Sequence, residues 1–354
     1  MTINEAKLEE FVGKVVTDLA AAEAGAVAYL GDRLGFYSLL AGAGPITADS
    51  LARKAGTNER LTREWLANQV AGGYVEYDAN ADTFELPDEH AAVLAEETSA
   101  VYVAGVLEIA AAMWADAGKV EAAFRSDGGV SWGDHDERLY SGVERLFGPL
   151  YRSQLTTAWI PALTGVEAKL TQGGRVADVG CGHGISTVIM AEAYPNSEFV
   201  GFDSHPASIE AAGKRAAEAG VTDRVRFDVA DAHGAATGET GFDLVCFLDC
   251  LHDMGDPVAA AAAARSILNE GGSVLVVEPK AADALTDNVN PVSRLYYSGS
   301  TFLCTPSSLA QTGAAGLGAQ AGPTVLTRVL RDAGFATAQV VAETPFNTII
   351  EARG

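Results

Sequence analysis

The stretch Arg175-Val-Ala-Asp-Val-Gly-Cys-Gly-His-Gly184 decides the fold of this 354-residue chain. It begins as a short apolar strand and continues into the glycine-rich turn Gly180-Cys-Gly-His-Gly184. The segment that follows, Ile185–Tyr194, has the apolar content of a buried helix. Because glycine lacks a Cβ, this turn lets the backbone approach another group closely. The stretch therefore predicts a strand, a tight turn and a helix, and the turn is a candidate ligand loop.

Strands and helices alternate from this stretch to the end of the chain. The further apolar segments are SEFVGFD (197–203), VRFDVAD (225–231), FDLVCFLD (242–249) and SVLVVEP (273–279). Helical patterns separate most of them, which is typical of a parallel, doubly wound sheet. ATAQVVAET (336–344) and NTIIEAR (347–353) read as a final pair of strands. We predict an α/β, doubly wound, seven-stranded Rossmann-like sheet.

The residues before this sheet have a different pattern. Residues 49–55 and 61–70 read as two helices joined by a turn, and YVEYD (74–78) and TFELP (83–87) as two short strands. Helix, turn, helix and strand pair form the winged-helix layout. A helical section follows, which we expect Gly128-Gly129 and Gly148-Pro149 to interrupt. The predicted domains are 1–97 (winged helix and dimerisation), 98–170 (helical linker and substrate cover) and 171–354 (ligand-binding sheet, with an insertion at about 282–322).

Composition limits the possible partners. The net charge is −23, from 24 basic and 47 acidic residues, and nucleic-acid binding rests on basic residues that displace counterions. The four cysteines show no paired metal-ligand spacing, so we predict no metal. The N-terminus is acidic, unlike a secretory signal, and the apolar run at 101–114 is too short to span a bilayer. We predict a cytoplasmic protein with no membrane or nucleic-acid partner.

Acidic residues stand at three predicted strand ends. Asp178 precedes the glycine turn, and Asp203 and Asp231 end the next two strands. A carboxylate at the position of Asp203 is placed to accept hydrogen bonds from ribose hydroxyls, and Asp231 could accept from an adenine amine. The glycine spacing is GxGxG, not the GxGxxG of dinucleotide folds, and an acid beside the loop would repel a pyrophosphate. The pattern favours a cationic cofactor.

The motif Asp178-x-Gly-x-Gly-x-Gly184 resembles the first motif of class I S-adenosylmethionine-dependent methyltransferases, and the resemblance covers about residues 170–354. It implies S-adenosylmethionine as cofactor and S-adenosylhomocysteine as product. The residues that it implies for cofactor binding are Asp178, Gly180, Cys181, Gly182, Gly184, Asp203, Ser204, Asp231, Ala232, Phe247 and Asp249.

The segment Phe247-Leu-Asp-Cys-Leu-His-Asp-Met-Gly-Asp256 is similar to the LHDW-type segment of small-molecule O-methyltransferases. Methyl transfer needs an aligned nucleophile and, for a hydroxyl, removal of its proton. The resemblance implies that His252 is the general base, although Met254 stands where the family has tryptophan. From the residues alone, a histidine that only orients the loop explains His252 equally well.

Residues 34–77 resemble the N-terminal dimerisation region of O-methyltransferases that act on plant phenolics and bacterial polyketides. This resemblance implies a homodimer formed through the N-terminal domain. Aromatic residues in the linker and insertion favour a small, apolar or aromatic acceptor. We predict that it is methylated on oxygen, with nitrogen as the second choice. Core packing explains each of these aromatic residues singly, but as a set they are the predicted acceptor-binding residues: Tyr140, Phe147, Tyr151, Trp159, Tyr296, Tyr297 and Phe302.

Two alternatives to an enzyme remain at this stage. One is a winged-helix transcriptional regulator that uses the cofactor fold as a sensor. Its recognition helix, ERLTREWLANQV (59–70), balances its arginines with glutamates, and the wing at 74–89 is acidic. Phosphate would repel that wing, so we expect no DNA binding. The other alternative is a cofactor-binding scaffold without turnover.

Overall fold

A computed structural model of the chain describes residues 3–126, 128–232, 234–236 and 238–354. The chain folds as two compact units. The first comprises Met1–Ala112 and Ser141–Pro149, and the second comprises Met113–Tyr140 and Leu150–Gly354. The domain boundaries that we predicted from the sequence stay predictions.

The first unit is the mostly helical winged-helix domain that the sequence predicted. Asn58 caps the second helix of the helix-turn-helix, because its side chain accepts a hydrogen bond from the Leu61 amide. Phe36, Tyr37 and Trp65 form the centre of its hydrophobic core. The elements of this unit are α1 (Glu5–Arg33), α2 (Phe36–Leu40), α3 (Ala48–Ala55), α4 (Glu59–Ala71), β1 (Glu76–Asp78), β2 (Thr83–Glu85), α5 (Asp88–Leu94) and the first part of α6 (Gly105–Ala123).

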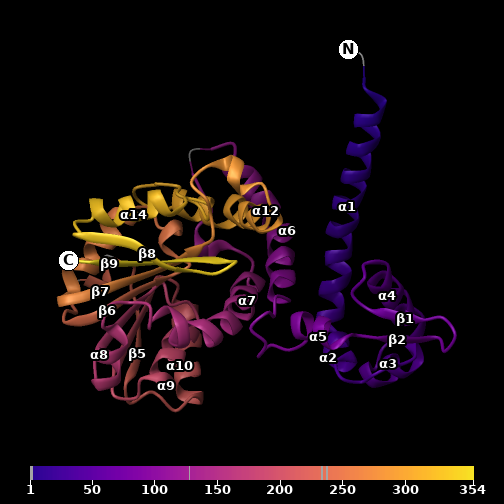
Figure 1. Cartoon of the computed structure of the whole chain (residues 1–354), viewed down its shortest axis with the longest axis horizontal. Coiled ribbons are helices and arrows are strands. Elements are labelled where there is room, and N and C mark those ends of the chain that lie inside the picture. The colour runs from indigo at the N-terminus through magenta and orange to yellow at the C-terminus, as the bar shows by residue number, and fades with distance from the viewer. Residues whose placement is uncertain (1–2, 127, 233, 237) are drawn as a thin grey trace. The chain divides into compact units, whose positions relative to one another are not determined.

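Helix α1 packs on its own unit only through its C-terminal part, and its N-terminal part projects beyond α2–α4 (Figure 1). Gly31 lies against Trp65, where a Cβ would come within 2.3 Å of the indole ring. The N-terminal turns instead expose apolar side chains. These exposed residues are Leu8, Phe11, Val12, Val15, Val16 and Leu19.

The second unit contains the predicted seven-stranded sheet, with strand order β5-β4-β3-β6-β7-β9-β8. Neighbours from β5 to β7 are parallel, and β9 is antiparallel to both β7 and β8. Its strands are β3 (Arg175–Val179), β4 (Glu198–Asp203), β5 (Val225–Val229), β6 (Phe242–Leu248), β7 (Leu268–Pro279), β8 (Thr337–Glu343) and β9 (Asn347–Arg353).

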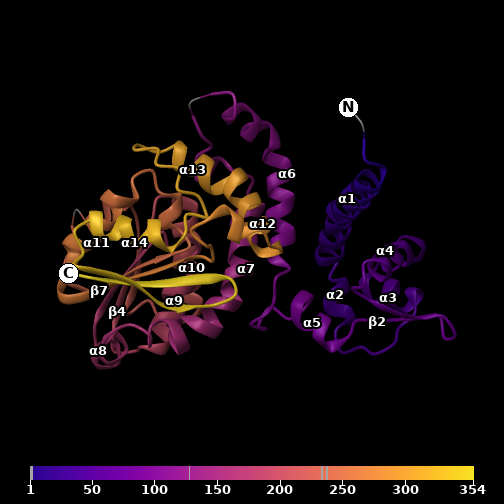
Figure 2. The ribbon, with the colours of Figure 1, turned by 45° about the horizontal axis from the view of Figure 1, so that its top comes forward.

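Helices cover both faces of this sheet: α14, which packs on α11, lies on the side opposite α9 and α10 (Figures 1 and 2). The helices of the unit are α7 (Arg138–Gln154, shared with the first unit), α8 (Val166–Gln172), α9 (Ile185–Ala193), α10 (Pro206–Glu218), α11 (Pro257–Ile267), α12 (Pro291–Gly299), α13 (Thr305–Leu309) and α14 (Pro323–Asp332). Short 3₁₀ turns occupy Trp132–Asp134, Gly234–Ala236, Leu251–Asp253 and Leu285–Asn288, and π turns occupy Leu155–Trp159 and Ser300–Cys304.

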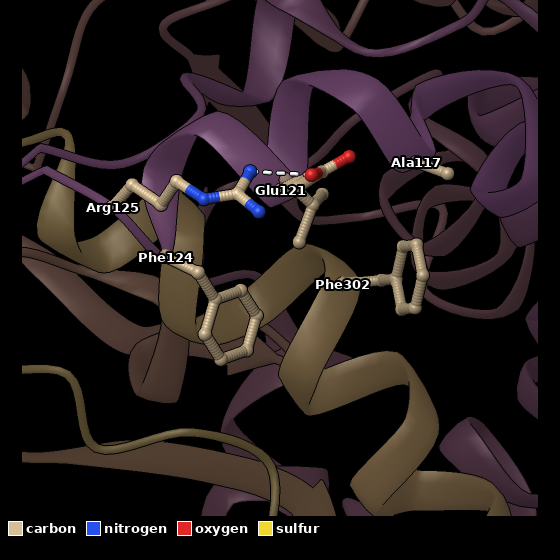
Figure 3. A pocket seen from close by; sticks show the side chains of 6 residues that line it. Ala117, Glu121, Phe124, Arg125 and Phe302 are labelled. Atoms are coloured by element: carbon tan, nitrogen blue, oxygen red, sulfur yellow. Dashed lines mark hydrogen bonds and ion pairs between the residues drawn. The ribbon is translucent and has the colours of Figure 1, made fainter.

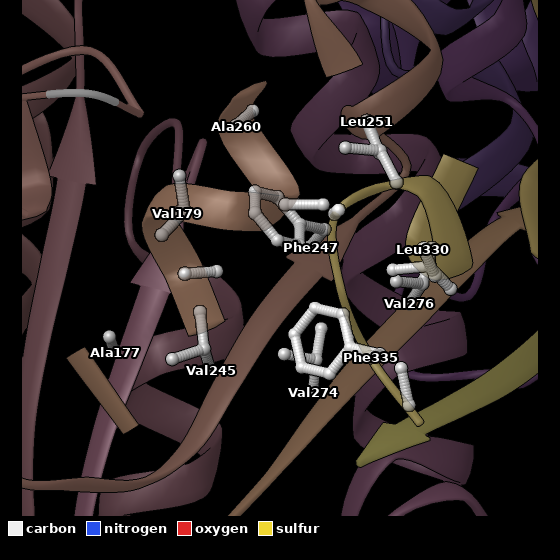
Figure 4. Packing of buried hydrophobic residues seen from close by; sticks show 14 of the residues in the cluster. Ala177, Val179, Val245, Phe247, Leu251, Ala260, Val274, Val276, Leu330 and Phe335 are labelled. Carbon is white, nitrogen blue, oxygen red and sulfur yellow. The ribbon is translucent and has the colours of Figure 1, made fainter. Parts of the chain in front are cut away.

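The core under the sheet explains why its central strands are almost continuously apolar. Phe247 on β6 and Val274 and Val276 on β7 are fully buried and pack near Phe335 (Figure 4). A parallel sheet covered on both faces needs apolar side chains on both sides of each strand. Burying each such side chain contributes about 1.5–3 kcal/mol. This rigid core holds the carboxyl ends of β3, β4 and β6 in fixed positions.

One sequence expectation was wrong. Gly148 and Pro149 do not interrupt the helical section, because α7 runs through both. A proline inside a helix loses one backbone hydrogen bond and strains the turn before it. The buried side chains of Tyr151 and Leu155 follow directly, and their packing outweighs the local preference.

Among the described residues, no helix is both long and apolar enough to cross a membrane.

Candidate functional site

The glycine turn joins β3 to α9 at the carboxyl edge of the sheet. Gly180, Gly182 and Gly184 all have left-handed backbone angles, with φ of 76°, 52° and 75°. A Cβ on Gly184 would lie 2.6 Å from Phe227, so that position has no room for a side chain. At Gly182, by contrast, no atom of the described residues lies within 4 Å of the Cβ position. The turn therefore packs closely at its end and leaves its middle open.

Asp178, at the end of β3, is buried beneath the turn. Its Oδ2 accepts hydrogen bonds of 2.6 Å from both the Ser186 and Thr187 hydroxyls. Its Oδ1 is buried and has no hydrogen-bond partner within the described part of the chain. Burial raises the pKa of this carboxyl, and the two hydroxyls work against that shift. Asp178 thus keeps one acceptor oxygen without a protein donor.

Asp203 ties the turn to the neighbouring strand. It ends β4, and its Oδ2 accepts a 2.9 Å hydrogen bond from the Gly182 amide. Its Oδ1 accepts a 2.8 Å hydrogen bond from the His205 amide. Each carboxylate oxygen has a second lone-pair direction, so Asp203 can still accept hydrogen bonds from a ligand.

The remaining predicted cofactor residues on this side differ in exposure. Asp231 and Ala232 follow β5, and Asp231 is exposed, with its Oδ1 accepting a 2.6 Å hydrogen bond from the Gly234 amide. Ser204 is exposed next to Asp203. Cys181 is buried, and burial raises the pKa of its thiol well above the usual range, so it is a neutral packing group.

Asp249 follows β6 in a strained conformation. Its φ is +52°, a left-handed value that residues other than glycine, asparagine and aspartate rarely adopt. Its Oδ2 accepts a 2.9 Å hydrogen bond from the Tyr151 hydroxyl, and its Oδ1 a 3.1 Å bond from the Asn347 amide group. Burial, then the charge of Glu278, raises the pKa of Asp249 to about 7. Phe247, which we also predicted here, has its side chain wholly inside the hydrophobic core.

His252 is buried between two carboxylates. Its Nδ1 contacts Glu278 at the end of β7, and its Nε2 lies 3.0 Å from Asp253 Oδ1. The second oxygen of Glu278 accepts from the backbone amides of Leu251 and His252 itself. Burial opposes a charge on the imidazole, but Asp253 and Glu278 outweigh burial and raise its pKa well above the usual range. His252 therefore bridges two acids, and their charges favour its protonated form.

Sequence reasoning missed Glu278 and Asn347, which hold His252 and Asp249 in place. Their signal is weak: Glu278 closes the apolar run of β7, and Asn347 is the first residue of β9, where a polar residue after a turn is ordinary. A lone acid inside the run SVLVVEP is nevertheless unusual, since a buried charge is retained only with partners. The acidic residue in this apolar run was therefore the sequence signal for Glu278.

Cys304 brings a third kind of side chain to this group. Ligand atoms of His252, Asp253 and Cys304 all lie within 4.8 Å of one another, which is close enough to surround a small cation. A protonated His252 offsets one of the two negative charges on its two sides, those of Asp253 and Glu278. Burial raises the pKa of the Cys304 thiol to about 12.

The predicted acceptor-binding aromatics do not form one cluster. Tyr151 and Trp159 are buried and meet edge to face at 5.9 Å, and Tyr296 donates a 2.8 Å hydrogen bond to the Phe346 carbonyl. Tyr140 instead stacks on His205, with ring centroids 4.7 Å apart. Tyr297 is half-buried on α12, and Phe147 belongs to the first unit. Acceptor binding by these residues stays a prediction.

Phe302 lies at a shallow depression of about 330 Å³ formed with α6 (Figure 3). Its other walls come from Ala117, Val120, Phe124 and the ion pair between Glu121 and Arg125. None of these residues belongs to the strand ends described above.

Comparison with known protein families identifies both parts of the chain. Residues 170–334 match the family model of a methyltransferase domain, and residues 22–96 match that of an Rv2258c-like winged helix-turn-helix domain. The chain thus contains a segment that matches a methyltransferase domain, preceded by one that matches a winged helix-turn-helix domain. Both assignments confirm the resemblance that the sequence motifs implied.

A curated relative is the 27-O-demethylrifamycin SV methyltransferase of Amycolatopsis mediterranei (strain S699). It is 33% identical over 148 residues, which are 40% of this chain and 53% of that protein. The match thus spans only about half the length of the relative. Ubiquinone biosynthesis O-methyltransferase of Bordetella avium (strain 197N) is 32% identical over 43% of this chain and 58% of its own length.

Solved structures share the whole fold. An O-methyltransferase family protein from Burkholderia thailandensis aligns over 100% of this chain and 99% of its own, with a TM-score of 0.69 and 19% identity. Human N-acetylserotonin methyltransferase, in complex with SAM, aligns over 97% of each chain, with a TM-score of 0.66 and 19% identity. At this identity the likeness concerns the fold.

Proposed function

We propose that this protein transfers a methyl group from S-adenosylmethionine to a small-molecule acceptor. One observation carries the proposal: Asp203 is hydrogen-bonded to Gly182, whose Cβ position is open, and the neighbouring strand end carries Asp178 with one acceptor oxygen that has no donor among the described residues. The methyltransferase-domain match over 170–334 supports the same conclusion.

The residues present fit this cofactor. The unpartnered Oδ1 of Asp178 suits the positively charged amino-acid end of such a molecule, and Asp203 retains lone pairs for ribose hydroxyls. Gly182 lets the backbone approach it without a side chain in between. When bound, S-adenosylmethionine supplies a methyl group on a cationic sulfur, which an aligned nucleophile can displace.

On the acceptor side, His252 is the proposed general base. Glu278 fixes its ring through Nδ1, so Nε2 faces Asp253 and the space beside Cys304. A hydroxyl acceptor must lose its proton during transfer, and a histidine oriented in this way receives it once it is neutral. Oxygen is the acceptor atom that we propose first, because the similar proteins with a stated activity are O-methyltransferases. Nitrogen is the second.

The acceptor is proposed to be apolar or aromatic. Tyr151 and Tyr296 stand on the segments next to Asp249 and Phe346, at the same edge of the sheet as His252. Such rings favour flat apolar molecules.

The winged-helix unit offers little positive charge to DNA. On α4, Arg60 pairs with Glu64, and Arg63 donates two hydrogen bonds to Asp82 in the wing. Both arginines of the helix that would read DNA are therefore engaged by acids. This supports our proposal that the unit is not a nucleic-acid reader.

We also propose that the chain forms a homodimer through α1. Its exposed apolar residues recur three or four positions apart from Leu8 to Leu19, which makes one stripe along the helix. A stripe of this kind is the surface that a second copy of the same helix can cover.

The dimer is tested by light scattering after size-exclusion chromatography. Phe11→Asp with Val15→Asp should yield the monomer mass, while Ala21→Asp, on the opposite face of α1, should leave the dimer intact. A monomeric wild-type protein at micromolar concentration would refute this part of the proposal.

Methyl transfer is tested with S-adenosylmethionine labelled in its methyl group and a panel of phenols, hydroxyl-bearing polyketides and aromatic amines. The expected result is label in a small-molecule product and formation of S-adenosylhomocysteine. If the folded protein binds S-adenosylhomocysteine but labels no member of a broad panel, the scaffold alternative replaces the enzyme.

A further inference from the structure

Residues 133–140 lie beside His205, next to the strand end that carries Asp203. Neither the motifs nor the family comparisons assign this segment a role in cofactor binding. We propose that Tyr140 is a positioning residue on the ribose side of the cofactor site, and that it acts through His205 on Asp203. The inference rests on the proposed function, because it concerns how the same site holds its cofactor.

Tyr140 stacks on His205, two residues after Asp203, and its ring also lies 6.5 Å from the ring of His183 in the glycine turn. Its ring and that of His205 are 4.7 Å apart at an interplanar angle of 29°. Gly133, in the same segment, approaches the other part of the imidazole, since a Cβ there would lie 3.4 Å from His205 Cδ2. His205 is thus enclosed by residues 133–140.

His205 is coupled to Asp203 through the backbone. The His205 amide donates to Asp203 Oδ1, while the Gly182 amide donates to Oδ2. The His205 ring is also fixed from the other side, since its Nδ1 lies 2.9 Å from the Ser208 hydroxyl. A shift of His205 therefore moves one of the two donors that orient the Asp203 carboxylate.

The segment that carries Tyr140 is itself anchored. The Tyr140 hydroxyl donates a 2.8 Å hydrogen bond to the Trp132 carbonyl. Burial and the nearby carboxylates of Asp116, Asp134 and Asp203 raise the pKa of Tyr140, which keeps this hydroxyl protonated. The position of the Tyr140 ring relative to the His205 ring is therefore fixed.

Asp116 on α6 forms the base of this anchor. This buried carboxylate lies 2.9 Å from His135 Nδ1, and it accepts hydrogen bonds from the Asp136 amide and from Lys119. Lys119 also donates to the Asp134 carbonyl. Three successive residues, 134–136, are thereby attached to α6, so Tyr140 stands on a rigid support rather than on a mobile loop.

The test is a double-mutant cycle of Tyr140→Ala and Asp203→Ala, read as the dissociation constant of S-adenosylhomocysteine by titration calorimetry. Tyr140→Ala should weaken binding by up to about tenfold, the upper end of what one aromatic pair contributes. In the Asp203→Ala background the same change should weaken binding less than about twofold, because the coupling partner is gone. Tyr140→Phe, which keeps the ring, should restore most of the affinity.

Tyr74→Ala, an exposed tyrosine of the winged-helix unit, is the matched control and should leave the dissociation constant unchanged. Melting temperatures identify variants that fail to fold, and for those Tyr140→Leu, which also removes the aromatic ring, replaces Tyr140→Ala in the cycle. Unchanged binding in Tyr140→Ala, or an equal loss in both backgrounds, would overturn the inference. If Asp203→Ala itself leaves the dissociation constant unchanged, the result contradicts the cofactor site of the proposed function and not only the role of Tyr140.

Discussion

Two parts of the sheet's carboxyl edge are built in different ways; after their proposed roles we call the ends of β3, β4 and β5 the cofactor edge and the ends of β6 and β7 the acceptor edge. At the cofactor edge, Asp178, Gly182 and Asp203 lie within one strand-turn-helix-strand unit, and backbone amides and small hydroxyls orient the carboxylates. At the acceptor edge, His252 and Asp249 depend on Glu278, Tyr151 and Asn347. The first edge is made by local chain geometry, and the second by side chains brought together from distant segments.

The two edges also differ in charge. The donors to Asp178 and Asp203 within the described part of the chain are neutral hydroxyls and backbone amides, which leaves the carboxylate charge available to a cationic ligand. The His252 ring contacts two carboxylates, those of Asp253 and Glu278, and the nearby carboxyl of Asp249 has its pKa raised to about 7. The cofactor edge therefore attracts a cation, while the acceptor edge holds and releases protons.

The largest expected effect concerns the proton at Asp249. Its folded-state pKa of about 7 lies above its usual value, so its contribution to stability is full at low pH and is lost as the pH rises through 7. Removing the charge with Asp249→Asn should therefore stabilise the protein above pH 7 by about 4 kcal/mol. Urea unfolding of both proteins from pH 5 to pH 8 measures the difference.

Burial is the main cause of the raised pKa; the charges of Glu278 and Asp253 add to it, while the Tyr151 hydrogen bond and His252 work against it. Asp231→Asn, an exposed carboxylate at the cofactor edge, is the matched control and should show no such pH-dependent gain. A gain for Asp249→Asn that is equal at pH 5 and pH 8 would argue against a raised pKa.

The next effect separates the two edges by function. His252→Ala should lower turnover about 100-fold or more, because the proton of the acceptor loses its base, yet it should spare S-adenosylhomocysteine affinity. Because Asp253 and Glu278 hold the His252 pKa well above its usual range, wild-type turnover should rise with pH through the alkaline range.

Glu278→Gln sharpens this prediction, since it keeps the shape of the side chain but removes one of the two charges. Its pH profile of turnover should move to lower pH. Turnover of His252→Ala equal to that of the wild type would leave His252 as a residue that only orients the loop.

The difference between the edges also explains how much the sequence could predict. The strand ending in Asp178, its glycine turn and the acid of Asp203 lie close together in the chain, so spacing alone indicated the cofactor edge. Both the seven-stranded sheet and the winged helix followed from periodicity and turns.

The partners of His252 and Asp249 are hidden from such patterns. Glu278 and Asn347 meet these side chains only after β7 and β9 have paired in the sheet. The prediction that Pro149 interrupts the helix was wrong for a related reason. Tertiary packing around Tyr151 outweighs the preference of proline to end a helix. Contacts between residues far apart in sequence decide these features, and no spacing records them.

The smallest expected effect tests the open middle of the glycine turn. Gly182→Ala places a Cβ in a left-handed residue, which costs about 1–2 kcal/mol of stability. Gly35→Ala is the matched control, because Gly35 has a φ of +70° and equal room for a Cβ in the first unit.

Thermal unfolding should show similar losses for the two variants, whereas only Gly182→Ala should weaken S-adenosylhomocysteine binding. Equal binding by both variants would mean that the ligand does not approach the turn at Gly182.

The most direct test of the central claim is calorimetric titration of the wild-type protein and Asp203→Ala with S-adenosylhomocysteine. The account predicts saturable binding by the wild type and a loss of roughly 2–4 kcal/mol in the variant, the contribution of one or two charge-assisted hydrogen bonds. A folded wild-type protein that binds no S-adenosylhomocysteine would contradict the account.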